Sequence, residues 1–157
     1  MSKDSVSNFI ENILIILSNL PSGLRTPIIK KRLKEFNDFG QSEKKEIINN
    51  ILMNYGKIER PKILNLFDSW LNSLSEMDIS SINSIFNSYL MELYLHPSEL
   101  KDFDNSFILS LFKLLENLPE NKRDKLWNCF IESILNTPDP KKFIKLIPSS
   151  NMTNNLD

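Results

Sequence analysis

The residues best suited to chemistry gather around the single histidine, His96. The acidic residues near it are those from which a cation site could be built: Glu92, Glu99, Asp102 and Asp104. A calcium-binding loop that started at Asp102 would need glycine at its sixth position and glutamate at its twelfth. Those positions hold Phe107 and Lys113. The pattern therefore does not predict a calcium site, and we expect Asp104 to cap a helix and His96 to lie in a turn.

Cys129 is the only cysteine, so nucleophilic catalysis would have to pair it with His96. On a helical wheel it falls well away from the apolar stripe of its helix, which consists of Trp127, Phe130, Ile131 and Ile134. Of the charged residues nearby, only Lys125 would favour a thiolate. We therefore expect an incidental or half-buried thiol.

Other catalytic and binding motifs fail on residue counts. The three glycines are isolated from one another and cannot form a phosphate-binding loop, and one histidine with one cysteine cannot supply the usual zinc ligands. We expect no catalytic, cofactor-binding or metal-binding residue. An enzyme that uses carboxylates from different helices remains the third hypothesis for the function, since no particular pair stands out.

Basic residues concentrate in the second predicted helix, where a docking patch would consist of Arg25, Lys30, Lys31, Arg32 and Lys34. The apolar face of that helix should be Ile29, Leu33 and Phe36, which leaves Lys30 and Lys34 on an outward face. Such a face fits an acidic protein partner or nucleic-acid phosphates. The sequence pI of 5.9 favours the protein partner.

The fifth predicted helix offers a second candidate surface, because residues 79–91 contain no charge. Its buried side should be Ile82, Ile85, Phe86, Tyr89, Leu90 and Leu93. The opposite, charge-free face consists of Ser80, Ser81, Ser84, Asn87, Ser88 and Met91. Interface cores are depleted of charge, so this face is either a partner surface or a solvated or intrachain one.

Composition places these surfaces on one domain. The 157 residues include 19 basic and 20 acidic residues and are 41% apolar, which is typical of a globular protein. We expect a single helical domain over residues 1–148 and a flexible tail over 149–157. The longest apolar run, residues 13–17, is too short for a membrane span, and residues 1–21 do not have the pattern of a signal peptide. We therefore expect a cytoplasmic protein with no membrane association.

Prolines and glycines divide the chain into stretches with helical apolar spacing. They predict helices near residues 5–20, 27–38, 43–55, 60–74, 79–95, 105–118, 120–136 and 140–147, with an extra turn at 98–103. Thr26 and Pro27 should start the second helix, Gly40 and Gly56 should be left-handed C-caps, and the nearly all-apolar first helix should be central. The connectors are about 20 residues apart, so consecutive antiparallel pairs would repeat about every 40 residues, which is the HEAT and armadillo range.

The two ends of the chain share a pattern at an offset of 98 residues. Leu17, Asn19, Leu20, Pro21, Arg25 and Ile28 align with Leu115, Asn117, Leu118, Pro119, Arg123 and Leu126. In both places a helix should end in Asn-Leu-Pro and a new amphipathic helix should follow. The chain resembles a HEAT-like unit in its period, without the repeat pattern of that family.

Together these patterns predict an all-α fold of about eight antiparallel helices, either a short HEAT-like helical-repeat stack or an orthogonal helical bundle. The function that fits best is a non-catalytic protein-protein interaction or scaffold module. The alternative is a nucleic-acid-associated regulator that uses the basic second helix.

Overall fold

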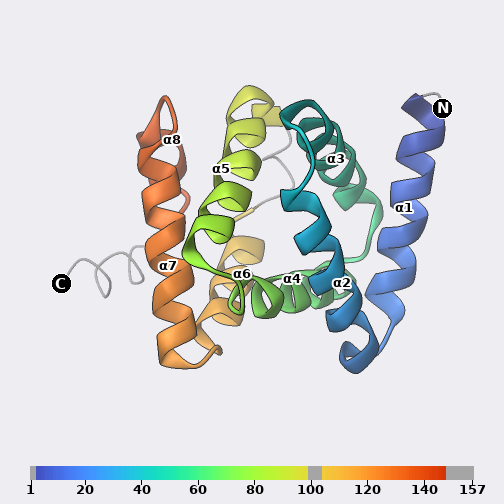
Figure 1. Ribbon diagram of the computed structural model, residues 1–157, viewed down its shortest axis with the longest axis horizontal. Helices are drawn as coiled ribbons and strands as arrows, with labels where there is room; N and C mark the ends of the chain where they lie inside the picture. The colour runs from blue at the N-terminus through green and yellow to red at the C-terminus, as the bar shows by residue number, and fades with distance from the viewer. Residues whose placement is uncertain (1–2, 99–103, 148–157) are drawn as a thin grey trace.

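The computed structural model describes residues 3–98 and 104–147, which form eight α-helices, one 3-10 turn and no strand. The elements are α1 (Lys3–Asn19), α2 (Ser22–Asn37), α3 (Gln41–Asn54), η1 (Tyr55–Lys57), α4 (Arg60–Leu74), α5 (Ile79–Leu95), α6 (Asn105–Glu116), α7 (Glu120–Leu135) and α8 (Pro140–Ile144) (Figure 1). The predicted all-α fold is confirmed. The predicted tail and almost all of the predicted turn at 98–103 lie outside the described residues.

The helices pack in two rows (Figure 1). In the first row α1 contacts α3, α3 contacts α5, and α5 contacts α7. In the second row α2 contacts α4, and α4 contacts α6. The rows touch where α1 meets α4 and where α2 meets α5. The closest packing is thus between alternate helices, whereas the connector spacing had predicted consecutive helices as the packed pairs.

Both rows have a regular spacing along the chain. In the first row α1, α3 and α5 begin 38 residues apart, and in the second row α2 and α4 do the same. Side-chain hydrogen bonds follow the same order, because nine residue pairs in the described part of the chain are bonded across 43 to 48 positions. These long-range side-chain hydrogen bonds therefore join elements that lie about one helix pair apart along the chain.

The predicted start of the second helix at residues 26–27 is wrong. α2 begins at Ser22, directly after Pro21, and contains Pro27, whose ring nitrogen cannot donate a hydrogen bond. α2 starts as α7 does, directly after the proline of an Asn-Leu-Pro segment, with Pro21 and Pro119 as the N-caps. Arg25 in α2 is 4% exposed and donates from Nε to Ser69 Oγ on α4 at 2.7 Å, which joins the first turns of α2 to α4.

The predicted left-handed C-caps are also wrong, since neither Gly40 nor Gly56 has a positive φ. The C-cap of α2 is instead Asp38, whose backbone lies in the right-handed region. The N–H of Asp38 donates to carbonyl oxygens of the last turn of the helix. Gly40 is the N-cap of α3 with φ −70° and ψ 165°, and Gly56 lies in η1. These turns therefore do not need the conformational freedom of glycine.

The two Asn-Leu-Pro segments have the same backbone geometry. The N–H of Leu20 donates to the carbonyl of Leu17 at 3.2 Å, and the N–H of Leu118 donates to the carbonyl of Leu115 at 3.2 Å. In each case the arginine N–H, of Arg25 or Arg123, donates to the carbonyl of the proline at 2.9 Å. The sequence similarity between the ends of the chain thus corresponds to the same local structure.

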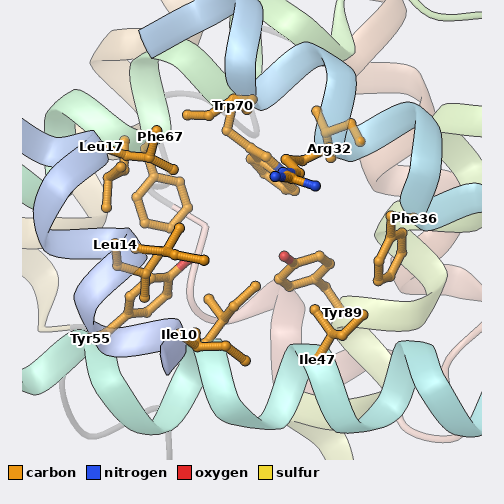
Figure 2. A pocket seen from close by; sticks show the side chains of 15 residues that line it. Ile10, Leu14, Leu17, Arg32, Phe36, Ile47, Tyr55, Phe67, Trp70 and Tyr89 are labelled. Carbon is orange, nitrogen blue, oxygen red and sulfur yellow. The ribbon is translucent and has the colours of Figure 1, made fainter. Parts of the chain in front are cut away.

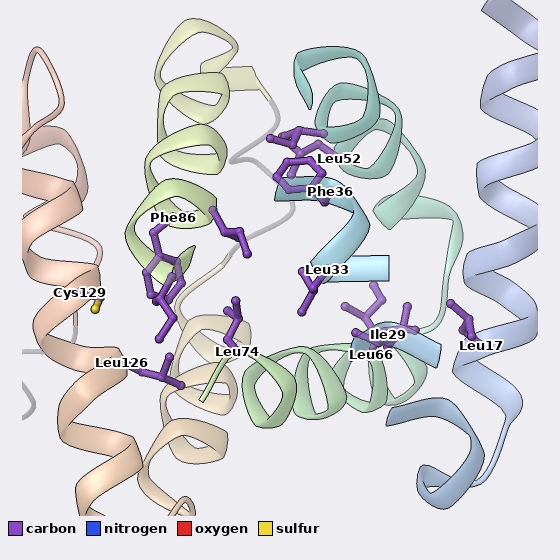
Figure 3. Packing of buried hydrophobic residues seen from close by; sticks show 14 of the residues in the cluster. Leu17, Ile29, Leu33, Phe36, Leu52, Leu66, Leu74, Phe86, Leu126 and Cys129 are labelled. Atoms are coloured by element: carbon purple, nitrogen blue, oxygen red, sulfur yellow. The ribbon is translucent and has the colours of Figure 1, made fainter. Parts of the chain in front are cut away.

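Two clusters of buried apolar side chains hold the rows together, and Figure 3 shows the larger one. The larger cluster confirms the predicted stripe of α2, which is Ile29, Leu33 and Phe36. On α5 the predicted buried side is confirmed, with Ile82, Ile85, Phe86 and Leu90 buried and Tyr89 and Leu93 partly buried. The smaller cluster lies at the C-terminal end and consists of Leu90, Trp127, Ile134, Phe143 and Ile147.

α7 contributes to both clusters, which corrects the expectation for Cys129. Trp127 is 5% exposed in the smaller cluster, so its predicted burial is confirmed. Cys129, which was expected off the apolar stripe, is buried in the larger cluster with Leu126 (Figure 3). A helix packed on two sides buries two stripes, and a single stripe on the wheel cannot reveal that.

The first helix is not central, contrary to its apolar composition. α1 lies at the end of the first row, where Phe9 and Ile16 are each 60% exposed (Figure 1). Its other side contributes Leu17 to the larger cluster. None of the described helices combines the length and apolarity that a membrane crossing needs.

Candidate functional site

A cavity of about 230 Å³ lies between the two rows, where five helices and η1 meet (Figure 2). Protein interiors are normally packed as densely as organic crystals. A space of this size between packed helices is therefore the first candidate for a binding site in the described fold.

The cavity walls are formed mostly by apolar side chains of the surrounding helices. α1 contributes Ile10, Ile13, Leu14 and Leu17, and α2 contributes Ile29, Leu33 and Phe36. α3 and α4 add further aliphatic and aromatic side chains. Residue spacing predicts which face of a helix turns inward, but it does not predict whether the facing side chains meet. Sequence reasoning missed the cavity for this reason.

Four polar groups border this apolar space: Arg32, Tyr55, Trp70 and Tyr89. The hydroxyl of Tyr89 points toward the centre of the cavity (Figure 2). Burial raises the pKa of Tyr89 and of Tyr55 above the usual tyrosine range, so both hydroxyls stay protonated. Trp70 Nε1 is buried and has no hydrogen-bond partner among the described residues.

An aromatic wall on α4 separates this cavity from a second one. Phe67 and Trp70 make an edge-to-face contact with ring centroids 5.9 Å apart, and both also line a cavity of about 140 Å³ on the side of α6 and α7. The wall continues to Phe86, whose ring centroid is 5.9 Å from that of Trp70, and to Tyr89 at 5.3 Å. Such contacts add stability beyond area burial, so the wall holds Trp70 in place.

The predicted basic docking patch is divided between the interior and the surface. Arg25 is buried and therefore does not belong to an exposed surface. Lys30 forms an ion pair with Glu76 at 2.5 Å, and Arg32 forms one with Glu35 at 3.0 Å. Lys31 and Lys34 are exposed.

The structure brings lysines of α7 close to those of α2. The Lys30 ion pair holds the pKa of Glu76 below its usual range, and the charges of Lys122 and Lys34 lower it further. Lys125 donates at 2.7 Å to the carbonyl of Met77, which is the next residue after Glu76. We call this region the α2–α7 basic surface; its members are Lys30, Lys34, Glu76, Asp78, Lys122 and Lys125.

The charge-free face of α5 starts beside that surface. Asp78 caps α5 by accepting a hydrogen bond from the N–H of Ser81 at 2.7 Å, and Ser80 is exposed next to it. Farther along, Asn87 and Met91 are exposed, while Ser81, Ser84 and Ser88 are partly buried. The face is thus accessible over the length of the helix.

The residues around His96 have structural roles where they are described. Asp104 caps α6 through Phe107 N–H at 2.8 Å, as predicted, and it also pairs with Arg60. His96 is exposed at the end of α5, and Glu92 is buried. Glu99 and Asp102 lie outside the described residues. In the part of the chain that the structure describes, no three potential metal ligands lie close together.

The Cys129 thiol is buried, whereas we expected an incidental or half-buried thiol. Its burial also affects its reactivity. Burial is the main cause that raises its pKa, and the nearby Glu132 charge raises it further. Both effects disfavour the thiolate, which is the reactive form.

Comparisons of the chain with protein family models, with curated proteins and with solved structures found no match. The cavity, the α2–α7 basic surface and the charge-free face are therefore interpreted from their own geometry.

Proposed function

We propose that the protein is a non-catalytic protein-protein interaction module built as a short HEAT-like stack of helices. The proposal rests on the packing of alternate helices, in which α1, α3 and α5 start 38 residues apart. In helical repeats each unit contacts only its neighbours, so the stack leaves long surfaces for partners. These surfaces then carry the function.

The partner contact we propose is an acidic segment that also carries basic residues, bound at the α2–α7 basic surface. Exposed Lys34 and half-exposed Lys122 attract carboxylates, while Glu76 and Asp78 lie among the lysines. A mixed pattern of this kind selects a partner with the complementary pattern and repels others. The adjoining charge-free face of α5 would extend the contact, since charge is depleted in interface cores.

The test uses charge changes on each surface. Wild-type protein, Lys34→Glu with Lys122→Glu, and Asn87→Lys with Met91→Lys would each serve as bait in extracts, and each captured protein would be purified and titrated calorimetrically. Lys141→Glu with Lys145→Glu is the matched control, because both lysines are exposed on or beside α8.

We expect a purified partner to bind the wild type and the α8 control, and to bind the Lys34/Lys122 variant at least about tenfold more weakly, as the loss of a charge-assisted contact implies. The Asn87/Met91 variant should weaken the same complex. A partner that binds all four proteins equally, or the failure of every purified candidate to bind, would contradict the proposal.

Nucleic-acid binding is the second candidate function, and one observation favours it. Lys122 of α7 lies close enough to the α2 lysines to act on the same glutamate, Glu76, so the basic residues of two helices are combined. Against it, the carboxylates of Glu76 and Asp78 lie within that surface and would repel phosphates.

A further inference from the structure

We propose that the cavity between the two rows binds an aliphatic chain that ends in a carboxylate, as in a medium-chain fatty acid. This inference is independent of the proposed docking function, because it concerns the inner faces of the helices and not their outer surfaces. It rests on three observations: the opening of the cavity to solvent, the arrangement of its polar groups, and its size.

The cavity reaches the protein surface at Arg32. This side chain lines the cavity and yet is 68% exposed, which makes it the natural point of entry. Its guanidinium is held by one ion pair with Glu35 in the next turn of the same helix. Exposed pairs of this type are weak, so a ligand carboxylate can compete for the guanidinium.

Two polar groups at the cavity are hydrogen-bond donors suited to an anion: the Arg32 guanidinium and the Tyr89 hydroxyl. Arg32 lines one side of the cavity, and the Tyr89 hydroxyl points toward its centre (Figure 2). A carboxylate has two acceptor oxygens and a charge opposite to that of arginine, so it satisfies this set.

The remainder of the cavity fits a flexible apolar chain. On the α1 side the wall is formed by Ile10, Leu14 and Leu17 (Figure 2). The volume of about 230 Å³ exceeds the roughly 150 Å³ that is sufficient to hold benzene in a dry protein cavity. It is below the range of about 300 to 1,000 Å³ that is usual for sites of drug-sized ligands. A medium chain is therefore the appropriate size class.

The experiment uses the full chain with Trp127→Phe, which leaves Trp70 as the only tryptophan. Decanoate, decanol and decylammonium would be titrated below their aggregation concentrations, followed by tryptophan fluorescence and by calorimetry. We expect saturable binding of decanoate and binding of decylammonium that is weaker by about tenfold or more, because the latter places a cation beside Arg32.

Two variants test the site itself in that background. Arg32→Gln should weaken the binding of decanoate about tenfold and leave the binding of decanol unchanged, since only the charge interaction is lost. Ile51→Phe should fill the cavity and abolish binding of both, whereas Ile16→Phe, on the exposed side of α1, should change neither. Circular dichroism would confirm that each variant is folded.

The proposal fails if decanoate does not saturate the protein, if decylammonium binds as tightly as decanoate, or if the folded Ile51→Phe protein keeps full affinity. None of these outcomes affects the docking proposal, whose variants lie on the outer surface.

Discussion

Arg25 Nε donates a hydrogen bond of 2.7 Å to the hydroxyl of Ser69, and both residues are buried at the junction of α2 and α4. The bond spans 44 residues and joins α2 to α4, which are neighbouring helices of the second row. It holds the first turns of α2, which begins at Ser22, against α4.

Arg25→Ala should lower the free energy of unfolding by about 3 kcal/mol, because it removes buried hydrogen bonds and the packing of the side chain. Urea denaturation followed by circular dichroism measures this. The matched control is Arg123→Ala at the equivalent position of the second Asn-Leu-Pro segment, where the arginine is partly exposed and pairs with Asp124. That change should cost less than about 1 kcal/mol. Equal effects would contradict a specific role for Arg25.

Trp127→Ala should destabilise the protein by about 3 to 5 kcal/mol, because the ring is buried against Phe112 with centroids 5.5 Å apart. Leu135→Ala, at an exposed position of the same helix, should change the stability by less than about 1 kcal/mol. Thermal and urea unfolding would both report the difference. A loss below about 1 kcal/mol for Trp127→Ala would mean that the smaller cluster contributes little to the fold.

The buried tyrosines predict a loss of stability in alkali. An unfolded tyrosine ionises near pH 10. In the folded chain, burial raises the pKa values of Tyr55 and Tyr89. Above about pH 10 the unfolded state therefore releases protons that the folded state retains, and the free energy of unfolding should fall as the pH rises. Urea titrations at several pH values would measure the slope, which should be shallower for Tyr89→Phe. An unchanged slope would contradict the burial of the Tyr89 hydroxyl.

The sequence predicted the helices where boundary signals and packing agree. Residues 60–74 and 79–95 were predicted with the observed bounds of α4 and α5, which begin at Arg60 beside Pro61 and at Ile79 after the Asp78 cap. The start of α2 was missed although the same Asn-Leu-Pro pattern gave the correct start of α7, which begins at Glu120 after Pro119. Pro27 favoured a later start, because proline is common at the first position of a helix, but in the structure it lies inside α2.

Two of the three candidate sites could not be predicted from the sequence, because they are formed by residues of different helices. The exposed parts of the charge-free face could be predicted, because they follow from the period of a single helix. The α2–α7 basic surface requires Lys34 and Lys122 to be brought together by packing. The cavity requires five helices to leave space between stripes that individually look like core. Neither arrangement is encoded in the spacing along one helix.

The most direct test of the interaction-module account is the binding of nucleic acid by the full chain. Fluorescence anisotropy with labelled duplex DNA and single-stranded RNA would be measured from low to near-physiological salt. The account predicts no binding even at low salt, because Glu76 and Asp78 lie within the α2–α7 basic surface and the net charge is −1. The contradicting result would be micromolar binding whose affinity for duplex DNA falls with a log-log salt slope of about −0.9 per phosphate, and which is lost in folded Lys34→Glu with Lys122→Glu.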